Sequence, residues 1–482
     1  APMLRGARLV ARLASAARSI RAPPRSSVGG AASSYSRTNI HNDRPPRVVA
    51  AFASLHHPRA TASPSSRGPG LGLPPHARTR RLAPPRSASR PMPSTSAAGD
   101  GDARGPTARA SSSSSHPPIP VPPRGSVTTV FAVTKPELLT DPVVQALKAS
   151  VEAASSNGRS FRLHLGCALE DFPSDALADP GSGSGDDPAA VLWWFGDAKV
   201  LDRILLEPVG SRVAWIHSGS AGVEHILAGA PTVKTHPAPL TNARGAFSSS
   251  LGEWALFGMM WFAKKVARMR DAHREGRWMR ESVGALSGKT CAIVGYGDIG
   301  RAVAVRAKAF GMRVVALRRN PERYKEGDEM VDEMAALGEI RRVAAEGDFV
   351  VLALPHTRET EGMFSRDVIA AMKPNATLVN VGRGAVVDEE ALIEALREGR
   401  IKGAALDVTA TEPLPEGHAL YDLEEKALLS FHCADLTEDY YELSFATFEK
   451  HLEAYAGGKD GKDGREKEEP PVWNLVDKSA GY

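Results

Sequence analysis

A glycine-rich turn between a strand-like and a helix-like segment limits the possible folds of this chain more than any other feature. The stretch CAIVGYGDIG places Gly295, Gly297 and Gly300 in the pattern G-x-G-x-x-G. The pattern alone is a weak signal, but here it follows a strand-like run and opens the helix-like run RAVAVRAKAF, which is the context a dinucleotide-binding turn requires. Its glycines would permit a tight turn, close approach of a pyrophosphate, and close packing of helix on strand. We therefore expect this turn, with Asp298 and Ile299, to bind a dinucleotide at the helix N-terminus; the alternative is a glycine turn without a ligand.

The strand-like run after this turn ends in Arg318 and Arg319 rather than in an acid. An NAD site uses an Asp or Glu in this region to hold the ribose 2′-hydroxyl. A carboxylate would repel the 2′-phosphate of NADP, whereas a guanidinium can bind it with two hydrogen bonds. We therefore expect NADP(H) to be favoured over NAD(H). The alternative is a pair of ordinary exposed arginines and an NAD site without its acid anchor.

Strand-like and helix-like segments alternate through two parts of the chain. The strand-like runs of the first part are SVTTVFAVT, FRLHL, AVLWWF, RVAWIHS and TVKTH, and those of the second are TCAIVG, RVVALR, DFVVLAL, ATLVNV, GAALDV and ALLSF. This alternation indicates parallel sheets covered by helices, and six strands suit one doubly wound nucleotide domain. Between the two parts, residues 249–275 predict one long helix, buried between two domains or against a second subunit.

The first 125 residues differ in composition from the rest. They hold 19 Arg, no Lys and three acids, a net charge of +16, so the remaining residues carry about −12 of the chain's +4. The basic whole-chain balance is therefore no sign of nucleic-acid binding. A segment rich in Ser, Ala, Pro and Arg cannot bury enough apolar surface to fold, so we expect it to be disordered. Its Arg-rich, acid-poor start is typical of organelle transit peptides, for chloroplast or mitochondrion alike; an untargeted basic tail, or translated upstream sequence, is the alternative.

Three cysteines, Cys167, Cys291 and Cys433, lie far apart in the sequence. This spacing supports neither a disulfide framework nor a zinc site, and we expect no metal. No run approaches the roughly 20 apolar residues that span a bilayer, so we expect no membrane partner.

Four polar residues follow strand-like runs of the second part. They are Arg383 in NVGRGAVVDEEAL, Asp407 and Glu412 in GAALDVTATEPLP, and His432 in LLSFHCADLT. Singly, each has an ordinary structural explanation, such as a surface charge, a helix start or a structural histidine. Because ligands of open α/β sheets bind beyond the carboxyl ends of the strands, together they predict a site near a nicotinamide.

With these motifs the chain resembles the D-isomer-specific 2-hydroxyacid dehydrogenases, which include glyoxylate and hydroxypyruvate reductases. The resemblance covers roughly residues 126–482 and rests on WIHSGSAGVEH, GKTCAIVGYGDIG, LALPHTRETEGM, LVNVGRGAVVDEEAL, ALDVTATEPLP and SFHCADLT. It implies a Rossmann-type doubly wound nucleotide domain inserted in a smaller flavodoxin-like α/β substrate domain. The domain boundaries expected are 1–125 for the disordered extension, 126–245 and 435–482 for the substrate domain, and 246–434 for the nucleotide domain.

The resemblance also implies a role for each matching residue. Arg383 would bind the substrate carboxylate and keto oxygen, His432 would donate a proton, and Glu412 would be the partner of that histidine. Asp407 would contact the nicotinamide carboxamide, and position 318 is where NAD-dependent relatives carry the acid. The further residues expected are Ser220, Ala221 and Gly222 for the substrate carboxylate, and Pro355, Thr360 and Val381 for the cofactor. The implied reaction is reduction of glyoxylate or hydroxypyruvate to the D-2-hydroxy acid by a homodimer.

Three residues depart from the family pattern or stand beside its motifs. The family usually has Pro where Phe431 precedes the histidine, and losing proline would remove a restraint on the loop that aims His432. Glu224 stands where Asp is frequent, and we interpret it as an early-helix charge rather than a ligand. Cys433 is interpreted as a small residue that fills space rather than as a site of redox control.

Trp193, Trp194 and Trp215 are expected in the core rather than in the pocket wall.

Other functions remain open at this stage. A non-enzymatic NAD(P)H sensor, like the transcriptional co-repressors on this fold, would keep Arg383, Glu412 and His432, although a presequence argues against it. Formate dehydrogenases use Gln as the partner of the histidine, so Glu412 disfavours that activity. A phosphoglycerate dehydrogenase is disfavoured because Arg318 replaces the expected acid and no regulatory domain follows.

Overall fold

The computed structural model describes residues 119, 122–155, 158–178, 188–323, 328–457 and 474–482. The predictions of disorder and of organelle targeting fall almost wholly on residues 1–118, outside the described residues, and stay predictions. No helix in the described part of the chain is long and apolar enough to cross a membrane.

The first sheet contains five parallel strands in the order β2-β1-β3-β4-β5. This is the flavodoxin-like order of doubly wound sheets. The strands are β1 (Val127–Val133), β2 (Ser160–Gly166), β3 (Ala189–Trp193), β4 (Val213–Ser218) and β5 (Leu240–Asn242). The helices of this part are α2 (Pro142–Ala153), α3 (Ser174–Leu177), α4 (Ala198–Leu206), α5 (Glu224–Gly229) and α6 (Thr232–Thr235).

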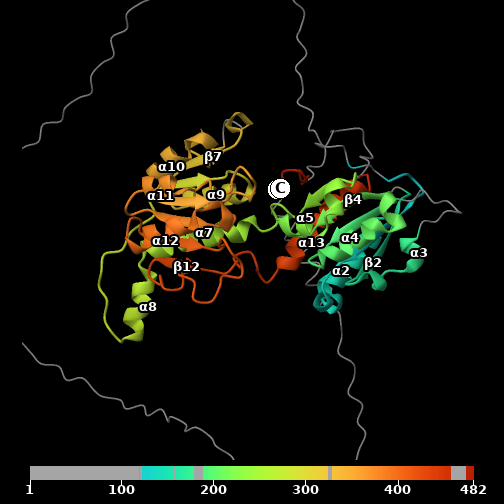
Figure 1. The fold of residues 1–482 in the computed structure, drawn as a ribbon, viewed down its shortest axis with the longest axis horizontal. Coiled ribbons are helices and arrows are strands. Elements are labelled where there is room, and N and C mark those ends of the chain that lie inside the picture. The colour runs from blue at the N-terminus through green and yellow to red at the C-terminus, as the bar shows by residue number, and fades with distance from the viewer. Residues whose placement is uncertain (1–118, 120–121, 156–157, 179–187, 324–327, 458–473) are drawn as a thin grey trace, which may run out of the picture. The chain divides into compact units, whose positions relative to one another are not determined.

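The C-terminal part of the chain returns to this first sheet. Helix α13 (Tyr440–Tyr455) contacts α2 (Figure 1). Its buried side chains belong to the same apolar cluster as those of α2. The indole Nε1 of Trp194 donates to Ser444 Oγ of α13 at 3.2 Å, and Trp215 stacks on Phe448 with ring centroids 5.5 Å apart. Together with Trp193, these tryptophans are at most 4% exposed, so the prediction that they belong to the core is confirmed.

The second sheet contains seven parallel strands in the order β12-β11-β10-β9-β6-β7-β8. Read from β8, this is the Rossmann order 3-2-1-4-5-6 with one strand added, as the sequence predicted. The strands are β6 (Thr290–Val294), β7 (Arg313–Arg318), β8 (Glu333–Ala336), β9 (Phe349–Leu352), β10 (Thr377–Asn380), β11 (Gly403–Leu406) and β12 (Ala427–Leu429). The helices are α7 (Ser248–Ala263), α8 (Val266–Arg274), α9 (Asp298–Ala309), α10 (Ile340–Glu346), α11 (Arg366–Ala371) and α12 (Glu389–Arg397).

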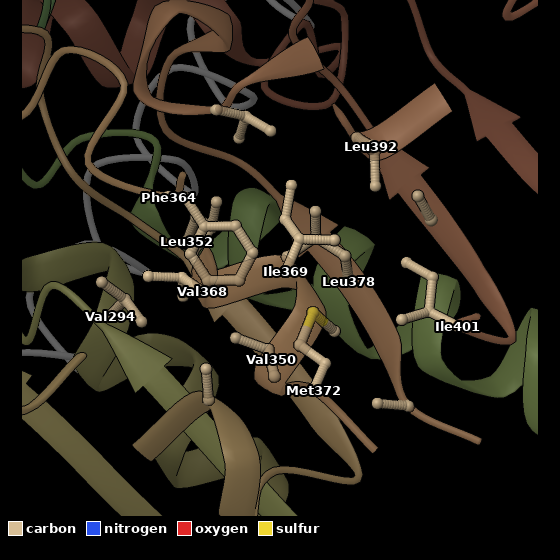
Figure 2. Close-up of a cluster of buried hydrophobic side chains, with 14 of the residues drawn as sticks. Val294, Val350, Leu352, Phe364, Val368, Ile369, Met372, Leu378, Leu392 and Ile401 are labelled. Atoms are coloured by element: carbon tan, nitrogen blue, oxygen red, sulfur yellow. The ribbon is translucent and has the colours of Figure 1, made fainter. Parts of the chain in front are cut away.

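Apolar side chains cover both faces of this sheet, which is why its strands are continuous apolar runs. On one face Val350, Leu378 and Leu352 meet Phe364 and Ile369 in a fully buried cluster (Figure 2). On the other face, side chains of α7 and α9 form a second cluster with the same strands. Each fully buried Val, Leu, Ile or Phe contributes roughly 1.5–3 kcal/mol relative to an exposed one, so these clusters fix the sheet whose strand ends carry the site.

The structure corrects the sequence reading at four places. The run TVKTH forms the helical turn α6 instead of a strand, and the short strands β5 and β8 were not predicted. The predicted helix 249–275 is divided into α7 and α8, because Lys265 adopts a left-handed φ of 56°. Most of α7 is buried in the core of the second sheet, and not only at a boundary between domains. The domain boundaries at 245/246 and 434/435 stay predictions.

Candidate active site

The glycine turn connects β6 to α9 at the point where the strand order reverses between β6 and β9. Gly295 has a left-handed φ of 104°, and a Cβ there would lie 2.6 Å from the carbonyl oxygen of Ala353. A Cβ on Gly300 would lie 2.2 Å from the Gly295 carbonyl oxygen, so helix and turn are in close contact. Beside Gly297, in contrast, no described heavy atom lies within 4 Å of the Cβ position. The space beside Gly297, next to the amides that begin α9, is therefore open. This arrangement suits the binding of a pyrophosphate.

Two arginines end β7 and continue beyond it. Arg318 is the last residue of this strand and forms no ion pair with any residue that the structure describes. Arg319 pairs with Glu359 at 2.6 Å, and its guanidinium lies 5.2 Å from the ring centroid of Tyr482. At least one cation at this strand end is therefore free to receive an anion, and the donor set fits a dinucleotide with a 2′-phosphate.

Of the remaining expected cofactor residues, Pro355 and Thr360 follow β9 and Val381 follows β10. Thr360 is 2% exposed, and its hydroxyl donates to the Pro355 carbonyl at 2.6 Å and accepts from the Thr357 amide at 2.8 Å. Val381 is buried, and its amide donates to the Leu352 carbonyl at 3.1 Å. These bonds give Thr360 a structural role that the sequence did not indicate, while contacts of the three residues with a cofactor stay predictions.

His432 and Glu412 form a directed pair. The Nδ1 atom of His432 lies 2.7 Å from Glu412 Oε2, and Glu412 Oε1 accepts from the Thr409 amide at 3.0 Å. Glu412 is thus held at both oxygens. Because Nδ1 faces the carboxylate, the Nε2 atom of the same ring is left for a substrate.

Asp407 holds the loop that carries His432. Asp407 is 3% exposed, and its Oδ1 accepts from Ser430 Oγ at 2.6 Å and from the amides of Cys433 and Ala434 at 3.1 Å each. The Asp407 carbonyl accepts from the His432 amide at 2.6 Å. The sequence did not reveal this role; contact of Asp407 with a nicotinamide stays a prediction.

Phe431 has a left-handed backbone with φ 55°, as does His432 with φ 56°. Proline fixes φ near −65°, so this loop conformation excludes it at position 431. Hydrogen bonds to Asp407 hold this loop, while the effect of having no proline at this position stays a prediction.

The cysteines are all free, with Cys291 buried and Cys433 exposed. Burial, followed by Asp407 and Asp435, raises the pKa of the Cys433 thiol. A raised pKa disfavours the reactive thiolate, which argues against redox control at this position. In the described part of the chain no group of three or more His, Cys, Asp or Glu residues could hold a metal ion.

Arg383 is paired with a residue that the sequence analysis did not connect to it. Its Nε lies 3.0 Å from Glu224 Oε1, its Nη2 lies 3.5 Å from Glu224 Oε2, and its Nη1 donates to the Gly382 carbonyl at 2.8 Å. Glu224 begins α5, as expected of an early-helix charge, and it also forms an ion pair with Arg383 that the sequence did not indicate. Burial alone would raise the pKa of the Glu224 carboxyl, but Arg383, a backbone hydrogen bond and His225 together lower it.

The loop after β4 lies against the same guanidinium. A Cβ on Gly222 would lie 2.0 Å from Arg383 Nη2, so a larger residue there would displace this guanidinium. The Ser220 and Ala221 carbonyls accept from the Ala243 amide at 3.1 Å and from Asn242 Nδ2 at 2.6 Å, respectively. Among the described residues, the amides of Ala221 and Gly222 have no protein acceptor. Free amides beside an arginine can bind a carboxylate.

Asp435 is a further acid of this site, three residues beyond His432. Burial, more than any other cause, raises the pKa of its carboxyl; Asp407 adds to the rise, and His432 and Arg383 oppose it. This carboxyl therefore lies within electrostatic reach of both cations. It forms no ion pair with any residue in the described part of the chain. Only its position next to the motif could have indicated it.

Comparison with known proteins identifies the family. Residues 256–434 match the model of the D-isomer specific 2-hydroxyacid dehydrogenase, NAD binding domain. The glyoxylate reductase of Thermococcus litoralis is 36% identical over 232 residues, which are 46% of this chain and 67% of that protein. The chain belongs to the D-isomer-specific 2-hydroxyacid dehydrogenases. A second relative in this family, the glyoxylate reductase/hydroxypyruvate reductase of Mus musculus, is 31% identical over 48% of this chain and 70% of its own length.

A solved 2-hydroxyacid dehydrogenase shares the fold. The enzyme from Xanthobacter autotrophicus Py2, determined in complex with NADPH and MES, is 26% identical, with a TM-score of 0.54. The alignment covers 75% of this chain and 100% of that one. The chain is therefore an oxidoreductase of the 2-hydroxyacid dehydrogenase type with a nicotinamide-nucleotide-binding domain.

Proposed function

We propose that this dehydrogenase reduces a small 2-keto acid, glyoxylate or hydroxypyruvate, to the D-2-hydroxy acid with NADPH as the preferred reductant. The observation that carries the proposal is the pair His432 Nδ1–Glu412 Oε2 at 2.7 Å, at the same strand ends as Arg383. The two relatives described above are named for glyoxylate and hydroxypyruvate, which supports this choice of substrate.

The substrate carboxylate binds to Arg383 and to the free amides of Ala221 and Gly222 in this mechanism. Arg383 keeps two N–H groups for this purpose, since its other three face Glu224 and the Gly382 carbonyl. The same guanidinium stabilises the negative charge that develops on the keto oxygen during reduction.

His432 supplies the proton. Glu412 orients the imidazole ring through Nδ1, which leaves the N–H of Nε2 for the oxygen of the substrate. A reduced nicotinamide bound beyond the glycine turn would supply the hydride. The chain's contribution is thus to hold the carboxylate, aim the proton and keep the loop of His432 fixed through Asp407.

The preference for NADPH rests on Arg318. This side chain ends β7 without an acid at the same position, so a 2′-phosphate would find a cation there rather than a repelling carboxylate. Arg319 could join it on exchanging Glu359 for the phosphate.

The test is the initial rate of the full chain with glyoxylate and with hydroxypyruvate, each with NADPH and with NADH. We expect turnover with NADPH, and a loss of about 10²–10⁴-fold in kcat for His432→Gln. His273→Gln, an exposed histidine of α8, is the matched control. Turnover with NADH alone would refute the argument from Arg318. Nucleotide binding without turnover of any 2-keto acid would favour the sensor.

We also propose that the protein is a homodimer. Phe257 on α7 is 45% exposed and Trp278 is 91% exposed, which leaves large apolar side chains for a second subunit. Light scattering of the chain and of Trp278→Ser would test this, since the variant should shift the equilibrium towards monomer. A monomeric parent chain would exclude the dimer.

We propose that the basic N-terminal segment directs the protein to chloroplast or mitochondrion. Its 19 Arg against three acids support this assignment. A fluorescent fusion of residues 1–125 tests it, because diffuse cytosolic fluorescence would contradict targeting.

A further inference from the structure

We propose that Arg244 binds the pyrophosphate of the nicotinamide nucleotide and releases Asp298 in order to do so. The inference adds one residue to the nucleotide site of the proposed function, and it does not depend on which keto acid is reduced. Arg244 precedes the matched residues 256–434 and stands outside the motifs on which the family resemblance rests. It lies in the short segment that joins β5 of the first sheet to α7 of the second.

The backbone of Arg244 is held on both sides. Its amide donates to Asn242 Oδ1 at 3.2 Å, and its carbonyl accepts from Asn474 Nδ2 at 2.8 Å. The next residue, Gly245, has a left-handed φ of 91°, and a Cβ there would lie 3.9 Å from Asp298 Cγ. The segment therefore passes directly beside the start of α9. A side chain on a backbone fixed in this way needs little further ordering to bind a ligand.

The side chain of Arg244 is directed at the glycine turn. Its Nε lies 3.4 Å from Asp298 Oδ2, and the side chain is 52% exposed. Asp298 is the first residue of α9 and follows Gly297, beside which the space is open. The terminal nitrogens of Arg244 donate to no residue that the structure describes. They are thus available beside the helix N-terminus that suits a pyrophosphate, and a guanidinium can bind two phosphate oxygens at once.

Asp298 has opposite effects on the free protein and on the complex. A carboxylate at the first residue of a helix is stabilised by the partial positive charge of the helix N-terminus. A pyrophosphate would bring two negative charges to the same amides, so this carboxylate would repel it unless Arg244 cancels the charge. An ion pair between two half-exposed side chains is weak because water screens both charges, whereas guanidinium–phosphate hydrogen bonds are strong. Arg244 therefore gains by exchanging Asp298 for the pyrophosphate.

Calorimetry of the full chain with NADPH and, separately, with NADH tests the exchange. Arg244→Gln should weaken the binding of both nucleotides by the same factor, about 10- to 100-fold, because both carry the pyrophosphate. Asp298→Asn should strengthen the binding of both by about threefold, because it removes the repulsion. Arg203→Gln is the matched control and should leave both affinities unchanged. Arg203 lies on α4, is also 52% exposed, and pairs with Glu170 at 3.1 Å.

The opposite signs separate a role in binding from a role in structure. If the ion pair only stabilised the segment, loss of either partner would weaken nucleotide binding. The double variant Arg244→Gln/Asp298→Asn should bind both nucleotides more tightly than Arg244→Gln alone. Urea unfolding shows whether each variant is folded. Should Arg244→Gln fail to fold, Asp298→Asn decides alone, since stronger binding supports the inference and weaker binding overturns it.

Other outcomes distinguish this inference from the proposed function. Parental affinity of Arg244→Gln for both nucleotides, or a loss confined to NADPH, would overturn the role of Arg244 at the pyrophosphate and leave the proposed function intact. The expected changes in nucleotide affinity, in a protein that turns over no 2-keto acid, would support the role of Arg244 and refute the proposed function.

Discussion

Removing the Asp407 carboxyl should release the loop that aims His432. In Asp407→Ala, the amides of Cys433 and Ala434 and the hydroxyl of Ser430 lose their common acceptor at 2.6–3.1 Å. The backbone bond from the His432 amide to the carbonyl at position 407 remains. The loop should therefore stay attached but lose its fixed conformation.

The magnitude follows from these bonds. Hydrogen bonds to a charged group contribute about 1.5–3 kcal/mol each. Ser430 and Cys433 can turn to water, whereas the Ala434 amide lies in a buried residue, so we expect a loss of about 3 kcal/mol in the free energy of unfolding. A displacement of His432 by about 1 Å should cost about 100-fold in kcat.

Urea unfolding and steady-state kinetics measure the two effects, and Asp407→Asn is the control. The asparagine keeps an acceptor oxygen for the same three donors, so its stability should fall by only about 1 kcal/mol. An alanine variant with parental stability and kcat would refute the anchoring role. A raised KM for NADPH in the asparagine variant at unchanged stability would instead support the predicted contact with nicotinamide.

Three further predictions concern the backbone, the pH dependence and the thiols. Phe431→Pro should unfold at lower urea concentration and lose kcat, because φ 55° is inaccessible to proline; parental values would show that the loop has another conformation. Burial, followed by a neighbouring histidine, holds the pKa of the fully buried His217 well below 6.5. The unfolded chain therefore binds a proton that the folded chain excludes, and the free energy of unfolding should fall as pH drops below about 6.5. The slope, at most about 1.4 kcal/mol per pH unit for this group, should be reduced in His217→Gln, and an unchanged urea titration would contradict the assignment. A maleimide should label the exposed Cys433 in the native protein but reach Cys291, whose pKa burial raises to about 12, only on unfolding, as mass spectrometry would show.

The sequence predicted the fold where apolar periodicity was strong. Continuous apolar runs such as RVVALR and TCAIV became strands of a sheet buried on both faces. The prediction of a strand at TVKTH failed because its three β-branched residues do not outweigh Pro231, which immediately precedes the helical turn. Strands as short as β5 and β8 contain too few residues to show the alternation of apolar and polar residues that predicts a strand.

The candidate site, too, was only partly predictable from the sequence. Residues at strand ends, such as Arg383 and His432, could be predicted because parallel strands bring their carboxyl ends to one edge. The pairing of Arg383 with Glu224 could not, since 159 positions separate the two residues and the pairing depends on how the chain folds between them. The bonds of Asp407 to the loop likewise depend on left-handed residues at 431 and 432, which no propensity of Phe or His indicates.

The return of α13 to the first sheet also affects the order in which the protein can fold during synthesis. Trp194 bonds to Ser444 across 250 positions, and Ser444 bonds to Gly219 across 225. Most of the core of the second sheet is built from residues 243–434, which are synthesised before α13. At 5–20 residues per second, the apolar face around Trp194 waits on the order of tens of seconds for its partner. The N-terminal core is thus the later one to be completed, because it needs the last helix of the chain.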